Sequence, residues 1–472
     1  MVGLLVALLT CACSMQDTPR AQTRGVGVYP GRPGESASPR LVAGGNTDRN
    51  LALGRAAKHS SSFDFDLTAQ LVTDGIVRDS DSDFLSVWKS AGSEGEWISV
   101  DLGAVSLVNR MIFHWTNAPV SGSILCSKDE IHWKELAKIA KGESFAEVRL
   151  PKTKARYFKA VLDRTDNGEP FVLSEWEIWG RGGMTVVPKE APLRMGCRQD
   201  LSGGEWLLQR ASEVTEPGEV VSGAGFKADG WIPATVPGTV LASYVNAGRV
   251  PDPNYADNQL FISESYFHSD FWYRDTFEAR IDSERQFLHF DGVNWKAEVY
   301  LNGRFLGKVA GAYQETVFDV TGFLKDGRND LAVRVICNEH FGQVTVQDAF
   351  NSGPNGGFLG ADNPTMHATV GWDWLPTVRG RNMGIYDDVY LCYTGPVTVE
   401  DPFVRTDLPL PDTTYADVLS QVRLVNHTDA PVSGVLRVAF GDLETNIEAT
   451  LAAGEDRLFN LDPMRLDHPA LW

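Results

Sequence analysis

Short apolar runs that alternate with polar residues constrain the fold of this 472-residue chain more than any other feature. Residues 96–102 and 108–115 show this pattern, and Asn302-Gly303 separates two such runs. Alternation with a period of two is typical of half-buried strands, and an Asn-Gly pair between strands is a strong hairpin signal. The good helix candidate, residues 239–247, is stopped by Gly248. The sequence therefore predicts an all-β protein.

Turn-rich stretches divide the chain into five segments. At about 150 residues per domain, this length predicts about three domains. Gly183, Pro188 and Pro192 mark one linker. We expect a signal or lipobox segment over 1–13, a flexible linker over 14–47, and β-domains over 48–182, 193–396 and 398–472. Because the last domain ends on the apolar pair Leu471-Trp472, we expect it to be truncated.

The charge balance limits the partners of the chain. Lys and Arg total 43 and Asp and Glu total 62, so the formal net charge is −19. Proteins that bind nucleic acids concentrate Lys and Arg, so a nucleic-acid partner is not expected. The chain also contains 13 Trp, whose rings pack in cores and can stack on sugar faces. A neutral or cationic partner fits this composition.

The N-terminus has the pattern of a targeting signal. Residues 2–9 are continuously apolar but fall far short of the roughly 20 residues that span a bilayer. Cys11 and Cys13 follow at once, and a Cys after a short apolar region resembles a bacterial lipobox. Either Cys is a candidate for lipidation. We expect a lipid-anchored protein of the bacterial cell envelope, in the periplasm or on the outer surface, with simple secretion as the alternative; contact with a membrane is expected only through the anchor.

Residues 48–182 resemble a discoidin, or coagulation-factor 5/8 type C, domain. The resemblance rests on short motifs spread over the segment: 71–75, 97–103, 127–129 with Trp133, 156–158 and 174–178. Bacterial members of this class resemble family 32 carbohydrate-binding modules. The resemblance implies a β-sandwich that binds sugar through loops at one end. Phe171 matches the place where similar modules have an aromatic residue that stacks on the sugar. Asn117 lies in a loop that often helps to bind the sugar. The alternative for Phe171 is a position in the core.

The same resemblance implies a structural calcium ion. Members of the class often hold it with the Asp of an Asp-Gly turn and a Glu near the C-terminal strand. Asp74 and Glu175 stand at those places, and carboxylate oxygens suit calcium. The alternative is that Asp74 only shapes its turn and that Glu175 is a carboxylate on the face of a strand.

Residues 193–396 resemble the N-terminal sugar-binding jelly-roll sandwich of family 2 glycoside hydrolases. The pieces that carry the resemblance are 231–240, 252–255, 271–274, 290–294, 299–303, 318–321 and above all Gly371-Trp372-Asp373-Trp374-Leu375-Pro376, followed by Arg379, Arg381 and 384–386. The Trp-Asp-Trp form, with Asn363-Pro364 shortly before it, is most similar to the β-mannosidase and exo-β-glucosaminidase branch. Classical β-galactosidases are less similar there.

The family 2 resemblance implies a sugar-binding loop. Asp373 matches a carboxylate that contacts the non-reducing-end sugar, and Trp372 and Trp374 would flank it. A carboxylate accepts two hydroxyl hydrogen bonds and also suits the amine of glucosamine. Arg381 and Asn355 are further candidates for substrate binding. The alternatives are a buried Asp373 paired with Arg379 or Arg381, and a packing role for Trp374.

Residues 398–472 resemble the start of the immunoglobulin-like sandwich that follows in this family. Retaining glycosidases need two carboxyl groups about 5 Å apart, and in family 2 these are Glu residues of a later barrel of about 250 residues. Only strand-like residues follow position 397, so we assign no catalytic residue and no cofactor for the chemistry.

These observations predict the N-terminal portion of a retaining exo-β-glycosidase that acts on mannose- or glucosamine-type glycans. The partner would be a β-linked oligosaccharide, and this portion alone is expected to lack activity. One alternative is a non-catalytic surface glycan-binding lipoprotein. Another is β-galactosidase or β-glucuronidase specificity.

Overall fold

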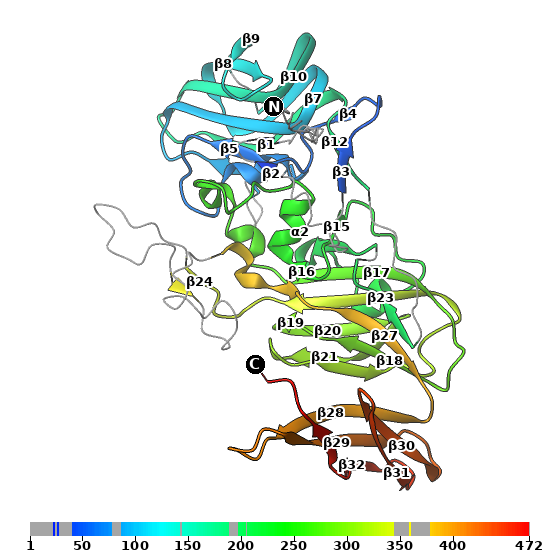
Figure 1. Cartoon of the computed structure of the whole chain (residues 1–472). Coiled ribbons are helices and arrows are strands. Elements are labelled where there is room, and N and C mark those ends of the chain that lie inside the picture. Colours follow the sequence, from blue (N-terminus) through cyan, green and yellow to red (C-terminus); the bar gives the residue numbers. More distant parts are fainter. Residues whose placement is uncertain are drawn as a thin grey trace, which may run out of the picture.

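Strands dominate the computed structural model, as predicted, and form three β-rich bodies that follow one another along the chain (Figure 1). The structure describes residues 22–23, 26–27, 40–77, 86–141, 144–187, 197–203, 205–343, 358–359 and 378–471. The all-β fold class is confirmed, because the described helices are short and the strands pair into several sheets. Within the described ranges, no helix is long and apolar enough to cross a membrane.

The first body is built on one eight-stranded antiparallel sheet. Its main path runs in the order β4-β11-β7-β10-β8-β9, with β5 paired to β7 and β6 to β11. The strands are β4 (Arg49–Asn50), β5 (Ala57–His59), β6 (Trp88–Lys89), β7 (Glu94–Asn117), β8 (Pro119–Ser127), β9 (Lys134–Ile139), β10 (Phe145–Thr165) and β11 (Val172–Arg181). A 3-10 helix, η1 (Ala69–Thr73), and a small sheet of β3 (Arg40–Ala43) with β12 (Met184–Val187) complete it.

The long strand β7 corrects one expectation. The sequence predicts that the strand over 96–102 ends at Gly103, but β7 continues to Asn117 through Gly103 at φ 77°. Its pairing with β10 shifts register here: Asp101 pairs with Tyr157 and Ser106 with Ala155, so β7 carries the extra residues of a β-bulge. The Asp101 carboxylate steadies this bend, because it accepts hydrogen bonds from Gly103 N at 2.6 Å and Arg156 Nε at 2.7 Å.

The second body packs two sheets against each other. One has the order β13-β27-β18-β22, from β13 (Arg198–Asp200), β27 (Val389–Thr394), β18 (Arg285–Phe290) and β22 (Thr316–Asp319). The other has the order β15-β14-β17-β23-β20-β21, from β15 (Ile232–Pro233), β14 (Leu207–Arg210), β17 (Phe271–Ala279), β23 (Gly327–Ile336), β20 (Lys296–Leu301) and β21 (Arg304–Ala310). A small third sheet holds β16 (Gly238–Thr239), β26 (Gly384–Ile385) and β19 (Val293–Asn294).

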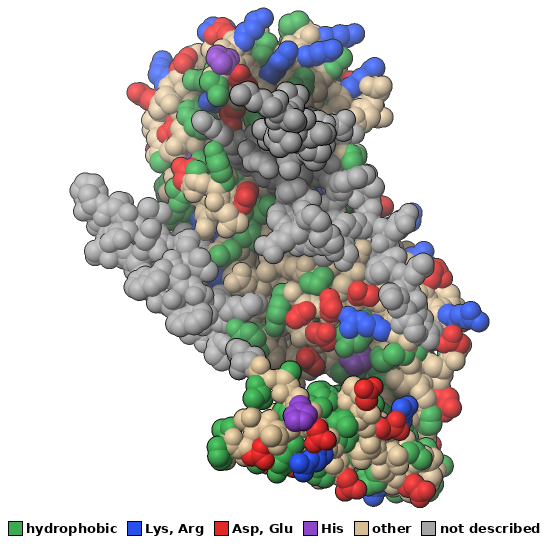
Figure 2. Space-filling view, viewed as in Figure 1, with side chains coloured by type: hydrophobic (Ala, Val, Ile, Leu, Met, Phe, Trp, Pro, Cys, Tyr) green, Lys and Arg blue, Asp and Glu red, His purple; other side chains and the backbone are tan. Residues whose placement is uncertain are grey.

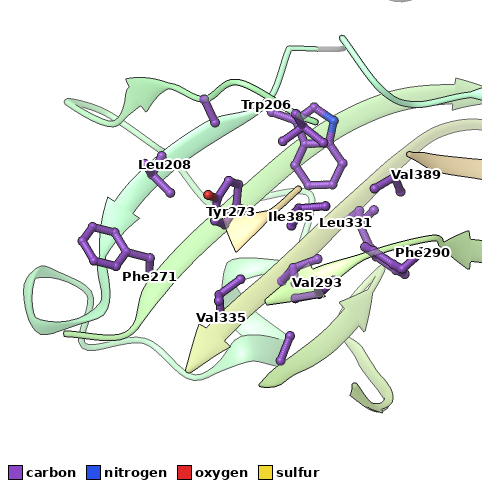
Figure 3. Packing of buried hydrophobic residues seen from close by; sticks show 14 of the residues in the cluster. Trp206, Leu208, Phe271, Tyr273, Phe290, Val293, Leu331, Val335, Ile385 and Val389 are labelled. Carbon is purple, nitrogen blue, oxygen red and sulfur yellow. The ribbon is translucent and has the colours of Figure 1, made fainter. Parts of the chain in front are cut away.

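Large apolar side chains from both sheets fill the space between them. Figure 3 shows Trp206 and Tyr273 beside Leu331, Ile385 and Val389, all of which are buried. At about 25 cal/mol per Å² of apolar surface, burial of such side chains is the main stabilising contribution. This core fixes the strands from which the loops of the second body leave.

Two local predictions in the second body are confirmed. Helix α2 (Val240–Asn246) lies inside the predicted range 239–247, and its N-terminus is capped because Ala242 N donates to Thr239 Oγ1 at 3.0 Å. The hairpin between β20 and β21 turns at Asn302 and Gly303, both with positive φ. Such φ values are what the predicted two-residue turn requires. The other α-helix is the one-turn α1 (Gly218–Val221).

The third body is the smallest. Strands β28 (Val397–Asp407), β29 (Tyr415–Asn426), β32 (Asp456–Asn460) and β33 (Met464–Asp467) form one sheet, and β30 (Val432–Phe440) pairs with β31 (Leu443–Leu451). Burial alternates strictly along β29, as the apolar-polar pattern predicts. Its core is small: Val422, Leu424, Leu436, Ala449, Leu451, Phe459 and Leu461.

Candidate functional site

Most predicted residues of the sugar-binding loop lie outside the described residues. These are Asn355, Trp372, Asp373 and Trp374, and the lipidation candidates Cys11 and Cys13 also lie outside them. Arg381 is described. The candidate site of the second body is therefore built from the described residues on the two sides of 344–377, a range of which only 358–359 are described.

The Arg381 side chain is buried in an ion pair, which corrects its prediction as a substrate-binding residue. Its side chain is fully buried and belongs to the 3-10 segment η6 (Arg379–Asn382). Arg381 Nη2 donates to Glu264 Oε2 at 2.6 Å and Nη1 donates to Glu264 Oε1 at 3.1 Å. Both carboxylate oxygens are thus bound in the bidentate arrangement that gives Arg–carboxylate pairs their geometric specificity. The guanidinium is committed to the protein and is not exposed to a sugar.

The same guanidinium joins two distant stretches of backbone. Arg381 Nε donates to the carbonyl oxygen of Phe341 at 2.8 Å, and Nη1 also donates to that of Val378 at 3.1 Å. Arg379 Nε lies 3.3 Å from Glu264 Oε1, and it donates a hydrogen bond to the carbonyl oxygen of Ile262 at 2.9 Å. We call Glu264, Arg379 and Arg381 the arginine clamp. It holds both ends of the segment that contains Trp372, Asp373 and Trp374.

Sequence reasoning missed Glu264 altogether. The residue lies between two serines, Ser263 and Ser265, in no recognisable motif. Its role depends on contacts with Arg379 and Arg381, which are more than one hundred positions away in the sequence. A buried carboxylate is costly unless it is paired and hydrogen-bonded, but nothing local in the sequence signals that Glu264 is buried.

Phe171 is a core residue, so its predicted role in stacking on a sugar is wrong. Its side chain is 0% exposed and belongs to the core of the first body, with Trp88, Phe113 and Trp176. Its backbone N–H donates to Ser90 Oγ at 2.8 Å, which fixes the start of β11 inside the sandwich. A ring in this position cannot contact a ligand from solvent.

Asn117 shapes the loop beside Phe171. Its Nδ2 donates to the carbonyl oxygens of Pro170 at 2.8 Å and Glu169 at 3.2 Å, and also to Asn167 Oδ1 at 3.2 Å. These bonds occupy the amide donors. The predicted role of Asn117 in sugar binding stays a prediction, and the structure gives it a definite part in holding the 167–170 loop.

An exposed aromatic ring that the sequence analysis did not select lies at the same end of the sandwich. Phe63 is 57% exposed, and Lys89 Nζ lies 3.8 Å from the centroid of its ring. Lys89 pairs with Val172 across the sheet, and Val172 pairs with Asn117. Phe63, Lys89 and Asn117 therefore mark one end of the sandwich. The available signal was an aromatic residue that follows three serines, Ser60 to Ser62, in a loop.

Asp74 and Glu175, the two predicted calcium ligands, come together at η1. Gly75 N donates to Glu175 Oε2 at 3.2 Å, Ile76 N donates to Asp74 Oδ1 at 2.9 Å, and the Ser86 hydroxyl donates to Asp74. Burial raises the pKa of Asp74 to about 6. Burial, and then the charge of Asp74, raises the pKa of Glu175 well above its usual range.

The chemistry of this pair fits a cation. Glu175 Oε1 is buried and has no hydrogen-bond partner, and two neighbouring buried carboxylates repel each other unless one of them takes up a proton or a cation lies between them. Among the described residues, no group of three or more His, Cys, Asp and Glu side chains is arranged to hold a metal. Calcium takes backbone carbonyls and water as well as carboxylates, so a two-carboxylate site suits it.

The fold defines a class: the first and second bodies are galactose-binding-like β-sandwiches. Comparison with protein families identifies two matching domains. Residues 206–387 match the glycosyl hydrolase 2 galactose-binding domain-like family, and residues 72–160 match the NedA-like galactose-binding domain of the F5/F8 type C group. The chain therefore joins a NedA-like F5/F8 type C domain to an N-terminal domain of family 2 glycosyl hydrolases, and both predicted resemblances are confirmed.

Parts of the chain are similar to two curated proteins and to one solved structure. The chain is 33% identical to an exo-β-D-glucosaminidase of Streptomyces avermitilis over 304 residues, which are 62% of this chain and 31% of that protein. It is 36% identical to a mannosylglycoprotein endo-β-mannosidase of Lilium longiflorum over 216 residues, 43% of this chain and 22% of that protein. The crystal structure of an exo-chitosanase of Amycolatopsis orientalis aligns with a TM-score of 0.49 at 24% identity over 59% of this chain and 30% of that one. The chain spans about a third or less of these relatives.

Proposed function

We propose that this chain is the N-terminal, sugar-binding portion of an exo-β-glycosidase that releases glucosamine or mannose from β-linked glycans. The observation that carries the proposal is the 33% identity to an exo-β-D-glucosaminidase over 304 residues. Support also comes from the family match over 206–387, which includes the Trp372-Asp373-Trp374 motif. The acid/base and nucleophile that retaining hydrolysis requires are assigned to no residue of this chain.

Asp373 has the central role in this proposal. Its carboxylate would accept hydrogen bonds from two sugar hydroxyls or pair with the ammonium of glucosamine, and charge-assisted bonds of this kind are about twice as strong as neutral ones. Trp372 and Trp374 would provide apolar walls. The formal net charge of −19 and the Asp and Glu side chains gathered on the visible face of the second body (Figure 2) favour a cationic sugar over an anionic one.

Binding of single sugars to the chain tests this role. Isothermal titration calorimetry with glucosamine, mannose and galactose is expected to show glucosamine or mannose bound most tightly. Asp373→Asn is expected to weaken that binding about tenfold or more, since a hydrogen bond to a charged group contributes roughly 1.5–3 kcal/mol. Asp442→Asn, on an exposed turn of the third body, is the matched control. Unchanged affinity in Asp373→Asn would exclude it as the sugar ligand.

Hydrolysis by the whole gene product tests the activity. Chromogenic β-glucosaminide, β-mannoside and β-galactoside are compared as substrates. Fastest turnover of the glucosaminide or mannoside supports the proposal, whereas fastest turnover of the galactoside would support the alternative specificity. No turnover of any of the three, with sugar binding intact, would favour a non-catalytic glycan-binding protein.

We propose a second sugar-binding function for the first body, favoured by its NedA-like galactose-binding match and by the exposed ring of Phe63. An exposed aromatic ring can bury the C–H face of a sugar, while the Lys89 ammonium and nearby loop carbonyls are available for hydrogen bonds to hydroxyls. Asp74 and Glu175 would hold a structural calcium ion that ties η1 to β11, and this ion would take no part in chemistry.

A further inference from the structure

The first and second bodies dock through two segments almost two hundred residues apart. Ser263 N donates to Gln70 Oε1 at 2.8 Å, Ser263 Oγ donates to the carbonyl oxygen of Asp66 at 2.5 Å, and Thr68 Oγ1 donates to that of Phe261 at 3.0 Å. The ring of His59 meets the ring of Phe261 edge-on at 5.1 Å. Most of these bonds involve backbone atoms, so they fix the path of the 261–264 segment against the first body.

Glu264 belongs both to this junction and to the arginine clamp. Its backbone N–H donates to the carbonyl oxygen of Phe65 in the first body at 2.8 Å. Its carboxylate, 7% exposed, binds Arg379 and Arg381 of the second body. The position of the carboxylate is therefore set by the docking of the first body, and the positions of the two guanidinium groups are set by the carboxylate.

Among the described residues, the two buried guanidinium groups of the clamp face one carboxylate, and arginine cannot give up its proton in a protein. Burial lowers the pKa of Arg379 to about 10, while the negative charges of Glu264 and Asp66 act in the opposite direction. The ring of Phe65 lies 5.6 Å from the Arg379 guanidinium, so the first body places an aromatic face beside Arg379.

The clamp lies close to the sugar-binding motif along the chain. Arg381 holds the carbonyl oxygens of Phe341 and Val378, which flank the motif on its two sides. Asp373 is five positions before Val378 in the sequence. A displacement of the clamp therefore moves the described chain at Phe341 and Val378, on both sides of the motif.

We propose that the first body positions the sugar-binding segment of the second, with Glu264 as the positioning residue that acts through Arg379 and Arg381. The inference rests on the proposed function, because the segment that is positioned carries Asp373. The inference gives the F5/F8 type C domain a role within the molecule. Docking of this domain raises the affinity of the second body for its sugar.

The test uses the whole chain with two substitutions at the junction. Asp66→Asn removes a negative charge from the docking segment of the first body, and Gln70→Ala removes a docking bond without changing the charge near the clamp. Asp163→Asn, an exposed Asp of β10 whose carboxylate accepts only from Ser121 among the bonds described, is the matched control. Two quantities are measured for each protein: the Kd for glucosamine by calorimetry, and hydrogen–deuterium exchange of peptides that cover 338–343 and 378–385.

We expect both junction variants to exchange faster at the two peptides and to bind glucosamine at least about threefold more weakly, with the control unchanged. Faster exchange without any loss of affinity would overturn the proposal, since the junction would then be purely structural. Unchanged exchange in both variants would overturn it as well. If the wild-type chain binds no glucosamine, the proposed function fails; the exchange data then still decide whether the first body controls the clamp.

Discussion

Phe63 and Phe171 show how the fold separates two residues that the sequence presents alike. Both follow small or turn-forming residues in loops, yet Phe63 is 57% exposed and Phe171 is 0% exposed. The difference comes from β11, which draws Phe171 into the sandwich through the bond from its N–H to Ser90 Oγ. Burial of this kind depends on tertiary packing, so a motif match alone could not show that Phe171 is a core residue.

The two phenylalanines should respond differently to removal of their rings. Phe171→Ala should lower the free energy of unfolding by about 3–5 kcal/mol, because it leaves a cavity in the core. Phe63→Ala should change it by less than about 0.5 kcal/mol and should abolish galactose binding by the first body. Chemical denaturation and calorimetry measure the two effects. Galactose affinity that survives Phe63→Ala would remove Phe63 from the sugar site.

Calcium should stabilise the chain through Glu175. A ligand that binds only the folded state at about one hundred times its Kd raises the free energy of unfolding by about 2.7 kcal/mol. We expect calcium to raise the melting temperature of the wild-type protein and to leave that of Glu175→Gln unchanged. Glu177→Gln is the control, because Glu177 lies on the same strand and binds His114 and Trp179 instead. An equal response in both variants would place the ion elsewhere.

At the level of elements, the junction should weaken in acid because of His59. Its Nδ1 accepts a hydrogen bond from the N–H of Ala69, the first residue of η1, at 3.2 Å. Burial lowers the pKa of His59 from 6.5 to about 4. Between these two values the unfolded chain binds a proton that the folded protein does not, so stability is full above pH 6.5 and falls as the pH drops towards 4.

The size of this acid effect is measurable. The pKa difference corresponds to a loss of about 3 kcal/mol once the pH is below 4. Urea denaturation at pH 7 and pH 4.5 should show a clear drop in the wild-type protein and a smaller one in His59→Gln. His132→Gln, at a side chain that is 85% exposed, should behave like the wild type. A pH dependence that is the same in both variants would mean that other groups cause it.

Periodicity predicted the elements well where local rules decide them. The helix over 239–247, the Asn302-Gly303 hairpin and the alternation of β29 all depend on residues close together in sequence, and the structure shows each. The end expected at Gly103 failed because β7 bulges at this point and pairs with β10 again beyond it. The arginine clamp escaped prediction because Glu264 meets its partners only in the folded chain.

At the scale of the whole molecule, the order of the bodies places the F5/F8 type C domain between the N-terminal segment and the glycosidase-type domain (Figure 1). The first body therefore lies between any anchor and the sugar-binding segment along the chain. A lipid anchor at Cys11 or Cys13 remains our proposal, since these residues lie outside the described part.

Replacement of the two N-terminal cysteines tests the anchor. We expect the double variant Cys11→Ser, Cys13→Ser to lose incorporation of labelled palmitate and to leave the membrane fraction, because a covalently attached acyl chain supplies the membrane affinity. The single variants show which cysteine carries the lipid. Cys197→Ser, at an exposed free cysteine, should keep the label. Label that persists in the double variant would contradict the anchor.

The arginine clamp also has a consequence for engineering. A single guanidinium binds the chain at Phe341 and again at Val378, so the two carbonyls are held at one point. Strand β23 before Phe341 and strand β27 after Val378 are paired within the two sheets of the second body. Phe341 and Val378 are therefore natural cut points for grafting a segment from another glycosidase, so that specificity could be exchanged as a cassette while the sandwich stays as it is.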